Sequence, residues 1–544
     1  MRFIPIISML AVLLAGSFAQ SVDETSRKVD QIFSPYDKPD SPGCALGVIR
    51  DGNFVYRKAY GMGSLELGVP LTTASVFYLA SVSKQFTAAS VVLAAEQGFL
   101  SLDDNIRKYI PKIPDYGHPI NLRQMLHHTS GFRDFETLLY LSGRQPGDLN
   151  SRQEMIALIA HQKALNNVPG DAWLYSNTNY FLLGEVVRQA TKKSLAEFAA
   201  ANIFQPLGMV HTRYYDDHTA VLAGRVAAYD PGPNGDFLVD WSTSFDLVGA
   251  GGLMSSIDDL LFWDRNFYDN KLGKGTLVNE LQTRGVLNNG KQIGYALGLE
   301  LSTYRGLPVV SHGGALFGYR TQILRFPQQR FTVACLCNLS SSDTNKLARQ
   351  VADLYLEKEL RPEANQTETS ANPRFPDASR FAGKYLDPHR HFVYVFTSSG
   401  LDLMARGGKL HRVGANQFRD LGTGTITFED TGRDMKSTLE MDGEIFFAGE
   451  RVKEPHLTAV ELEADAGQYT SAELDATYNL SVEKGSLILT VGWNPPLQLT
   501  PVAPDEFDNQ DFGTIVFHRD AHHQVDSFRL FTVNARDLSF ERVH

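Results

Sequence analysis

The sequence predicts an α/β domain, in which an antiparallel sheet is flanked by helices, followed by two all-β antiparallel barrels. Three observations lead to this prediction. Strand-like segments lie at both ends of residues 20–360, and helix-like segments lie between them. A polar stretch at 361–377 then separates this part from the remainder. The remainder is strand-like throughout and repeats once. A chain of 544 residues is too long for one hydrophobic core, so several domains are expected.

The N-terminal segment has the pattern of a secretory signal peptide. One basic residue, Arg2, precedes an apolar run from Phe3 to about Gly16, and the small-x-small site Ser17-Phe18-Ala19 follows. We expect residues 1–19 to be removed, which leaves an exported protein, periplasmic or secreted, without a stable membrane span. An uncleaved anchor is the alternative, but the apolar run is short for a span.

The elements of residues 20–360 follow from their local patterns. The segment CALGVIRDGNFVYRKAYG predicts two strands around the turn pair Asp51-Gly52. Helices are predicted at 83–97, 122–127, 153–161 and 180–190. Strand patterns return in LPVVSHGGALFGYRTQILRFPQQRFTVACLCNL, and the helical DTNKLARQVADLYLEKEL closes the region. Strands from both ends of the region therefore form one sheet, with the helices packed on it.

The C-terminal part contains a duplication. FAGKY at 381–385 matches DAGQY at 465–469, GTITF at 424–428 matches GTIVF at 513–517, and ERV occurs at both 450–452 and 541–543. The matches keep the same order, as a duplicated domain gives. Each copy, 378–455 and 456–544, is small, and a closed barrel of about eight short strands leaves no exposed edge.

Composition limits the partners. A net charge of -11 argues against binding to nucleic acid, which requires a concentrated basic face. We expect a small-molecule or short-peptide substrate, and the sequence leaves the oligomeric state open. With three cysteines, Cys44, Cys335 and Cys337, the fold does not depend on a disulfide framework. Buried free thiols are favoured over a bridge to Cys44.

A serine and a lysine three residues apart begin an unusually apolar helix. In YLASVSKQFTAASVVLAAEQGFL, Ser81 and Lys84 share one helical face, and residues 85–95 carry no charge. A buried ammonium is costly unless it is paired or used, and a serine hydroxyl needs a base to become a nucleophile. The Ser-x-x-Lys pattern alone is a weak indication, because a capping serine and a solvated lysine also produce it. The apolar helix places Lys84 near a core and favours a catalytic role.

Further motifs strengthen this interpretation. Tyr175-Ser176-Asn177 precedes a helix, and His312-Gly313-Gly314 lies on a predicted strand. QMLHHTSGF, PLGM and GAGGLMSSIDDL lie between them or nearby. Together and in this order, the motifs resemble the penicillin-recognising serine hydrolases, which include class C β-lactamases, DD-peptidases, D-aminopeptidases and related esterases. The resemblance covers residues 25 to 358, and the two repeats resemble the small, lipocalin-like β-barrels appended to D-aminopeptidase-like enzymes.

The resemblance implies a role for each motif. Ser81 would be the acylated nucleophile, and Lys84 and Tyr175 would share the proton transfers. Which of these two is the base in acylation stays open, but a nearby ammonium would favour a Tyr175 phenolate. Asn177 would hold both the substrate amide and Lys84. The resemblance implies neither a cofactor nor a metal.

The third motif would bind the substrate. Backbone N–H groups of Ser81 and of Ala315, which follows Gly314, would stabilise the oxyanion. In penicillin-degrading and carboxypeptidase relatives this motif begins with lysine, whereas here it begins with His312. A neutral histidine offers no cation to a substrate carboxylate, so amino-acid amides or short esters are favoured over penicillins.

Several other residues have simpler interpretations. The pairs His127-His128 and His522-His523 lack a third ligand at metal spacing, so structural or surface roles are expected. Tyr295 and Tyr319 are candidates to line the pocket, and Trp241 and Trp263 are predicted to lie in the core. The segment 491–513 has four acidic residues and is a candidate to reach the catalytic cleft, although an ordinary surface loop is an equal alternative.

The sequence thus predicts an exported serine hydrolase of small amides and peptides, similar to a D-aminopeptidase. A carboxylesterase and a β-lactamase or DD-carboxypeptidase are alternatives with the same fold. A non-catalytic protein that binds peptidoglycan fragments or lipids is an alternative of another class. The complete set of Ser81, Lys84, Tyr175 and Asn177 disfavours a non-catalytic role.

Overall fold

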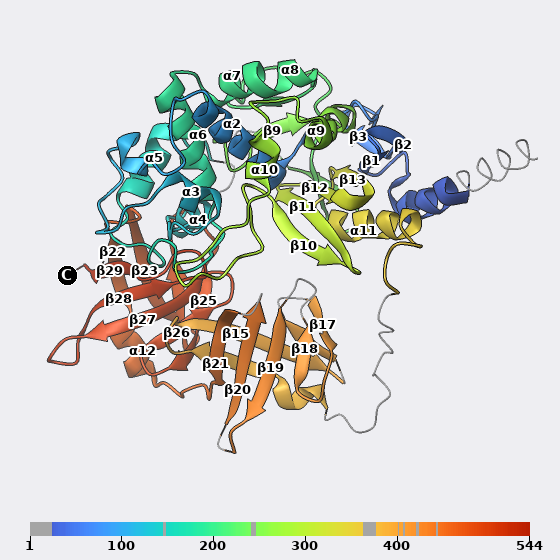
Figure 1. The fold of residues 1–544 in the computed structure, drawn as a ribbon. Helices are drawn as coiled ribbons and strands as arrows, with labels where there is room; N and C mark the ends of the chain where they lie inside the picture. Colours follow the sequence, from blue (N-terminus) through green and yellow to red (C-terminus); the bar gives the residue numbers. More distant parts are fainter. Residues whose placement is uncertain are drawn as a thin grey trace, which may run out of the picture.

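The structure is a computed structural model (Figure 1). It describes residues 24–144, 148–240, 246–362, 377–400, 402–405, 408–419, 424–432, 434–441 and 444–543. The predicted signal peptide, Trp241 and nearly all of the predicted linker lie outside these residues. Among the described helices, none is both long and apolar enough to cross a membrane.

The central sheet of the first domain joins strands from both ends of that domain. Its order is β10-β11-β12-β13-β1-β2, and each neighbouring pair is antiparallel. The strands are β1 (Cys44–Arg50), β2 (Asn53–Tyr60), β10 (Glu300–Tyr304), β11 (Leu307–Leu316), β12 (Tyr319–Phe326) and β13 (Phe331–Cys337). The central strands β1 and β13 are buried along almost their whole length, because helices cover both faces of the sheet. This confirms the predicted α/β class.

Helices pack on the sheet and form a second lobe beside it (Figure 1). They are α2 (Lys84–Glu96), α3 (Leu122–Leu126), α4 (Phe135–Leu141), α5 (Arg152–Ala160), α6 (Asn177–Thr191), α7 (Leu195–Ala199), α8 (Gln205–Leu207), α9 (Ile257–Asp269), α10 (Leu277–Leu281) and α11 (Thr344–Tyr355). Helix α2 is buried from Lys84 to Ala94, as its all-round apolar sequence predicts. Short strand pairs complete the domain: β3 (Met62–Ser64) with β4 (Val69–Pro70), β5 (Phe77–Tyr78) and β6 (Arg213–Tyr214) with β9 (Leu253–Ser255), and β7 (Tyr229–Pro231) with β8 (Phe237–Val239).

The duplicated region forms two closed barrels of eight antiparallel strands, as predicted. The first contains β14 (Gly383–Asp387), β15 (Phe392–Ser399), β16 (Asp402–Ala405), β17 (Gly408–Arg412), β18 (Gln417–Arg419), β19 (Thr425–Asp430), β20 (Met435–Met441) and β21 (Glu444–Arg451). The second follows helix α12 (Ala459–Asp465) and contains β22 (Gly467–Ser471), β23 (Ala476–Glu483), β24 (Ser486–Thr490), β25 (Leu497–Ala503), β26 (Glu506–Asn509), β27 (Gly513–Arg519), β28 (Val525–Phe531) and β29 (Leu538–Arg542).

The repeated motifs occupy equivalent places in the two barrels. The tyrosine of each first strand, Tyr385 or Tyr469, donates its hydroxyl to a backbone oxygen four residues earlier, at 2.9 Å in both copies. An arginine of each last strand, Arg451 or Arg542, lies over that tyrosine ring. The first and last strands pair in each copy and close the barrel, which removes their exposed edges.

Aromatic side chains fill the barrel interiors. Phe396, Phe418 and Phe428 are buried together in the first barrel, and Tyr478 and Phe528 in the second. Rings such as Phe528 and Phe540 stack at a centroid distance of 4.5 Å. A ligand-binding barrel encloses a cavity, whereas these interiors are packed with side chains. The packing counts against the lipid-binding alternative.

The cysteines differ from the expectation of free thiols. Cys44 on β1 lies directly opposite Cys337 on β13, and the two form a disulfide. Cys335 stays a buried free thiol. The expectation was wrong because the sequence does not reveal register. Once β1 and β13 pair in this register, the two sulfurs face each other across neighbouring strands.

The second barrel packs against the helical lobe below α3 and α4 (Figure 1). Its buried residues belong to the same hydrophobic cluster as the first domain, whereas the first barrel forms a cluster of its own. Arg133 and Glu473 make an ion pair across this contact, and both side chains are at most 2% exposed. Removing one partner of such a pair costs about 3–5 kcal/mol. This shared core makes the second barrel part of the stability of the first domain.

Candidate active site

Ser81 lies at a tight turn in front of helix α2. The 3-10 turn Ala80–Ser83 holds it, and Ala80 has a φ of 48°, a left-handed conformation that side chains rarely adopt. Such strain persists only where the surroundings impose it, and it is typical of functional sites. Ser83, Lys84 and most of α2 behind the turn are buried, while Ser81 itself is partly exposed. The turn therefore presents one hydroxyl at the edge of a rigid core.

Lys84 is fully buried and has three hydrogen-bond acceptors. Its Nζ donates to Ser81 Oγ at 3.1 Å, to Asn177 Oδ1 at 2.8 Å and to the Ala250 carbonyl at 2.7 Å. Burial lowers the pKa of Lys84 to about 7, although the nearby acidic groups of Glu136 and Asp134 oppose this shift. Near neutral pH a large share of the amine is thus unprotonated and can accept a proton.

Tyr175 contacts the same serine hydroxyl as Lys84 does. Its hydroxyl donates to Ser81 Oγ at 2.9 Å, and Lys84 Nζ lies 4.8 Å from the centre of its ring. Burial raises the pKa of Tyr175 well above its usual range, and the charge of Glu136 adds to this. The expected phenolate was therefore wrong for the resting site. Desolvation is the largest cause of this rise, and it keeps the hydroxyl protonated.

Asn177 and its neighbours come from the start of helix α6. The Asn177 backbone N–H donates to Asp134 Oδ2 at 2.5 Å, which fixes the first turn of the helix. The other oxygen of Asp134 caps α4 by accepting from the N–H groups of Glu136 and Thr137. One carboxylate thus ties the starts of two helices to each other beside Lys84.

His312 lies on β11 and is buried beside Tyr295. Its Nδ1 lies 2.7 Å from the Gly313 carbonyl, so Nδ1 carries the proton and Nε2 accepts from the Tyr295 hydroxyl at 3.0 Å. Burial, with the charge of Lys84 as a second cause, lowers the pKa of His312 to about 4. The imidazole is therefore neutral across the physiological range, in agreement with the expectation that it supplies no cation.

Strand β11 passes directly beside the serine turn at Gly314. A Cβ on Gly314 would lie 2.3 Å from the Leu79 carbonyl, so only glycine permits this approach. Strand β10 pairs with β11 only up to Ser311, and the following part of that edge, including Ala315, is not covered by β10. Ala315 is thus exposed on this open edge of β11, one residue after the close approach to the serine turn.

The other residues singled out in the sequence have structural surroundings. His128 is buried beneath Tyr175, with ring centres 4.3 Å apart, and its Nδ1 accepts from Ser176 N–H and from the Asn179 side chain. His127 contacts two backbone carbonyls. Trp263 is buried in the core, as predicted.

Tyr319 and the barrel loop contact other parts of the first domain. The Tyr319 hydroxyl donates to the Val226 carbonyl, and its ring contacts Tyr78. Loop 491–513 approaches the end of α4. The N–H of Trp493 donates to the Gly143 carbonyl at 3.3 Å, and Phe512 packs on Tyr140. The segment thus contacts the C-terminal end of α4 and the turn that follows it.

Sequence reasoning missed two acidic residues of the site, Asp134 and Glu136. Both come from the stretch GFRDFETL at the start of α4. Burial and the charge of Asp134 raise the pKa of Glu136 to about 7, and Lys84 lowers it. The Glu136 side chain remains partly exposed. The acidic D-x-E pattern, which begins three residues after the end of HHTSG, was the available signal.

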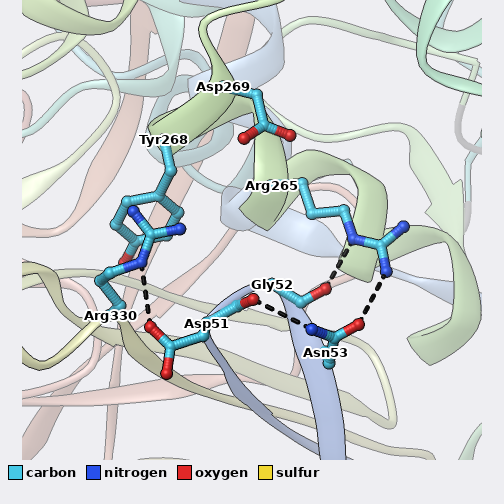
Figure 2. Close-up of a pocket in the computed structure, with 7 residues that line it drawn as sticks. All are labelled: Asp51, Gly52, Asn53, Arg265, Tyr268, Asp269 and Arg330. Carbon is cyan, nitrogen blue, oxygen red and sulfur yellow. Dashed lines mark hydrogen bonds and ion pairs between the residues drawn. The ribbon is translucent and has the colours of Figure 1, made fainter.

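A surface pocket lies elsewhere, at the turn between β1 and β2 (Figure 2). It is lined by Asp51, Gly52, Asn53, Arg265, Tyr268, Asp269 and Arg330. Both arginines are engaged within the protein: Arg330 pairs with Asp51 at 3.1 Å, and Arg265 donates to the Gly52 carbonyl at 2.6 Å. The pocket contains none of the residues that the sequence predicts for the site.

Comparisons with known proteins agree with this geometry. The chain matches the family described as Beta-lactamase over residues 29–356. A D-aminopeptidase of Brucella canis is 25% identical over 536 residues, which cover 92% of this chain and 96% of that protein.

Solved structures share the fold. An octameric penicillin-binding protein homologue from Pyrococcus abyssi has a TM-score of 0.56 and 20% identity, and the match covers 86% of this chain and 98% of the other. D-amino acid amidase from Ochrobactrum anthropi SV3, complexed with L-phenylalanine amide, has a TM-score of 0.52 and 22% identity, with 62% and 99% covered. From the family match over most of its first domain and the serine site described above, the chain belongs to the beta-lactamase family of serine hydrolases.

Proposed function

We propose that this chain is an exported D-aminopeptidase, which hydrolyses small amides and short peptides through an acyl-enzyme on Ser81. One observation carries the proposal: the Ser81 hydroxyl is in hydrogen-bond contact with both the buried Lys84 amine at 3.1 Å and the Tyr175 hydroxyl at 2.9 Å. A nucleophile, a base with its pKa near neutrality and a proton donor are thus in contact.

Acylation uses both partners of the serine. Neutral Lys84 takes the Ser81 proton as Oγ attacks the carbonyl carbon of the substrate. Tyr175 gives its hydroxyl proton to the leaving nitrogen as the C–N bond breaks. The result is an ester on Ser81, a free amine, a Lys84 ammonium and a Tyr175 phenolate. The ammonium lies over the tyrosine ring, so the two opposite charges formed in this step stabilise each other.

Deacylation reverses both proton transfers. The Tyr175 phenolate takes a proton from water as the water oxygen attacks the ester carbonyl. Lys84 returns its proton to Ser81 Oγ when the ester bond breaks. The enzyme regains its starting protonation, and the net reaction is hydrolysis of one amide by one water. Backbone N–H groups of Ser81 and Ala315 would hold the oxyanion in both halves, and each such donor is worth about 3 kcal/mol.

The acidic residue Glu136 beside the site favours substrates with a free amine. Glu136 is partly exposed at the first turn of α4, and its charge acts on both Lys84 and Tyr175. A carboxylate at this place would attract the α-ammonium of an amino-acid amide. His312 is neutral and offers no matching cation to a carboxylate. The charges of the site therefore match an N-terminal amine better than a penicillin or a peptide C-terminus.

Two further observations support the details. The relatives and neighbours named D-aminopeptidase and D-amino acid amidase act on D-amino-acid derivatives, as their names state. The pattern of residues 1–19 supports export, since it combines a basic residue, an apolar run and a small-x-small site.

A substrate panel tests the proposal. The mature chain would be assayed with the p-nitroanilides of D-alanine and L-alanine, N-acetyl-D-alanine p-nitroanilide, a p-nitrophenyl ester and a chromogenic cephalosporin. We expect the highest kcat/KM for D-alanine p-nitroanilide and a large loss on N-acetylation, which removes the ammonium. Equal rates with and without the acetyl group would contradict recognition of the amine. Activity confined to the ester would favour the esterase alternative.

A further inference from the structure

The second barrel holds the loop that builds one side of the active site. This loop, Gly131–Asp134, lies between α3 and α4 and receives contacts from two turns of the barrel. One turn joins β22 to β23 and contains Glu473. The other joins β28 to β29 and spans 532–537. We refer to these contacts together as the barrel clamp.

The first contact is the buried ion pair. Arg133 Nη1 donates to Glu473 Oε2 at 2.5 Å and to Gln162 Oε1 at 2.9 Å. Glu473 also accepts from the backbone N–H of Lys163 at 2.8 Å and from that of Ser539 at 3.2 Å. Its carboxylate thus joins two places in the first domain to strand β29 of its own barrel. A carboxylate in this position is costly to bury unless each of these donors is in place.

The second contact uses backbone groups of the 532–537 turn. The Asn534 carbonyl accepts from the Asp134 N–H at 2.9 Å and from the Asn166 side chain at 2.9 Å. The Arg536 N–H donates to Asn166 Oδ1 at 2.9 Å. Arg133 Nη2 donates to the Arg536 carbonyl at 2.6 Å. Residues 133 and 134 are therefore fixed by the barrel through both side chain and backbone.

The clamp continues directly into the catalytic constellation. Asp134, whose N–H bonds to the barrel, accepts the Asn177 N–H, and the Arg133 carbonyl accepts the Thr178 hydroxyl at 2.6 Å. Asn177 in turn accepts from Lys84 Nζ. The path from Glu473 to Ser81 thus runs through Arg133, Asp134, Asn177 and Lys84, and it consists of hydrogen bonds and of the chain link between residues 133 and 134.

We propose that Glu473 and the 532–537 turn are positioning elements of the active site, which hold Arg133 and Asp134 so that Asn177 meets Lys84. This inference rests on the proposed serine mechanism, because it concerns the geometry of the same site. It assigns the second barrel a role in the rate of the chemical step, in contrast to a role for loop 491–513 in lining the cleft. The first barrel has its own core and lacks these contacts among the described residues.

A matched pair of variants tests the proposal in the full chain. Glu473→Gln removes the charge at the clamp. Asp465→Asn removes a carboxylate of the same barrel that is also buried and paired with an arginine, Arg519 at 2.7 Å, but that pair stays within the barrel. We expect Glu473→Gln to lower kcat for D-alanine p-nitroanilide by about 10- to 100-fold with little change in KM, since small misplacements cost rates of this order. Asp465→Asn should lower the melting temperature without lowering kcat.

A milder variant and a double-mutant cycle complete the test. Asn166→Ala removes two bonds of the clamp without leaving a buried charge. It should also lower kcat, and it tests the proposal even if Glu473→Gln does not fold. The losses from Asn166→Ala and Asp134→Asn should not multiply, because both break the same path. The proposal would be overturned if Asn166→Ala folds and keeps the wild-type kcat. It would also be overturned if Asp465→Asn loses kcat as the clamp variants do, in proportion to its loss of melting temperature.

A second readout separates this inference from the proposed function. A fluorophosphonate labels an activated serine directly and needs no substrate of known identity. Equal labelling of wild type and Ser81→Ala would show that the proposed nucleophile is wrong. Labelling that depends on Ser81 but is as fast in the clamp variants as in wild type would overturn the clamp alone.

Discussion

Lys84 Nζ lies 2.8 Å from Asn177 Oδ1, although the first residue begins α2 and the second begins α6. The contact extends a chain of hydrogen-bonded polar groups at Ser81, because Lys84 and Tyr175 also bond to its hydroxyl. A buried lysine is tolerated at this point since three oxygens accept from it. The unusual placement of a lysine at the start of an apolar helix is thereby explained by its partners and by its proposed use as a base.

Lys84 and Tyr175 should behave as one unit. We expect Lys84→Ala and Tyr175→Phe each to lower kcat by several orders of magnitude, and the double variant to be little worse than either single one. The reason is that both act on one proton path through Ser81 Oγ. Steady-state kcat with D-alanine p-nitroanilide measures this. Losses that multiply in the double variant would mean that the two groups act independently.

The pH profile should have an acidic limb set by the Lys84 environment. Lys84 acts as a base in its neutral form, and its pKa is about 7, so kcat/KM should fall as the pH drops below 7. Glu136 raises the pKa of Lys84, so Glu136→Gln should lower that pKa and move the limb to lower pH. A limb that stays in place, or that moves to higher pH, would contradict this arrangement.

Glu136→Gln should also affect substrate choice. Loss of the charge should raise KM for D-alanine p-nitroanilide but leave KM for its N-acetyl form nearly unchanged, because only the former has an ammonium. A hydrogen bond to a charged group contributes about 1.5–3 kcal/mol, or roughly 10- to 100-fold. Parallel changes for both substrates would place the amine site elsewhere.

His312 should restrict the enzyme to substrates without a carboxylate. We expect slow cephalosporin hydrolysis by the wild type, and a higher ratio of cephalosporin to anilide turnover in His312→Lys. Because His312 is buried near Lys84, the added ammonium should also lower anilide turnover. The ratio of the two kcat/KM values is the measurement. Efficient cephalosporin hydrolysis that the substitution leaves unchanged would show that this position does not set the substrate class.

The Cys44–Cys337 disulfide should stabilise the central sheet. It joins β1 to β13, and a disulfide of this kind contributes about 2–4 kcal/mol. We expect a lower melting temperature in reductant, and one reactive thiol, Cys335, when the protein is denatured without reduction. Cys335→Ser serves as the control and should keep its response to reductant. Three reactive thiols before reduction would contradict the pairing.

The sequence predicted those features that depend on local pattern. The helix 83–97 corresponds to α2 at Lys84–Glu96, and 153–161 to α5 at Arg152–Ala160, because the apolar run of the first and the Ser151 cap of the second are local features of each segment. Helix α6 begins at Asn177, before the predicted 180, because Asp134 fixes its first turn from another segment. The two barrels followed from the repeated motifs, since equivalent positions need equivalent side chains.

Features that depend on contacts between distant residues could not be predicted from the sequence. The Arg133–Glu473 pair and the Cys44–Cys337 bridge each join residues far apart along the chain, and nothing local marks their partners. The protonation of Tyr175 was misjudged for a related reason. The proximity of Lys84 suggested a phenolate, but desolvation of the hydroxyl has the larger effect on its pKa, and desolvation emerges only once the fold is assembled.

The most direct test of the account is the covalent state of Ser81. Intact-mass spectrometry would follow the mature protein with a fluorophosphonate, in wild type and in Ser81→Ala, and peptide mapping would locate the adduct. The account predicts a single adduct on Ser81, none in Ser81→Ala, and loss of D-alanine p-nitroanilide turnover in step with labelling. Ser81→Ala that still turns over the anilide at the wild-type rate would contradict it.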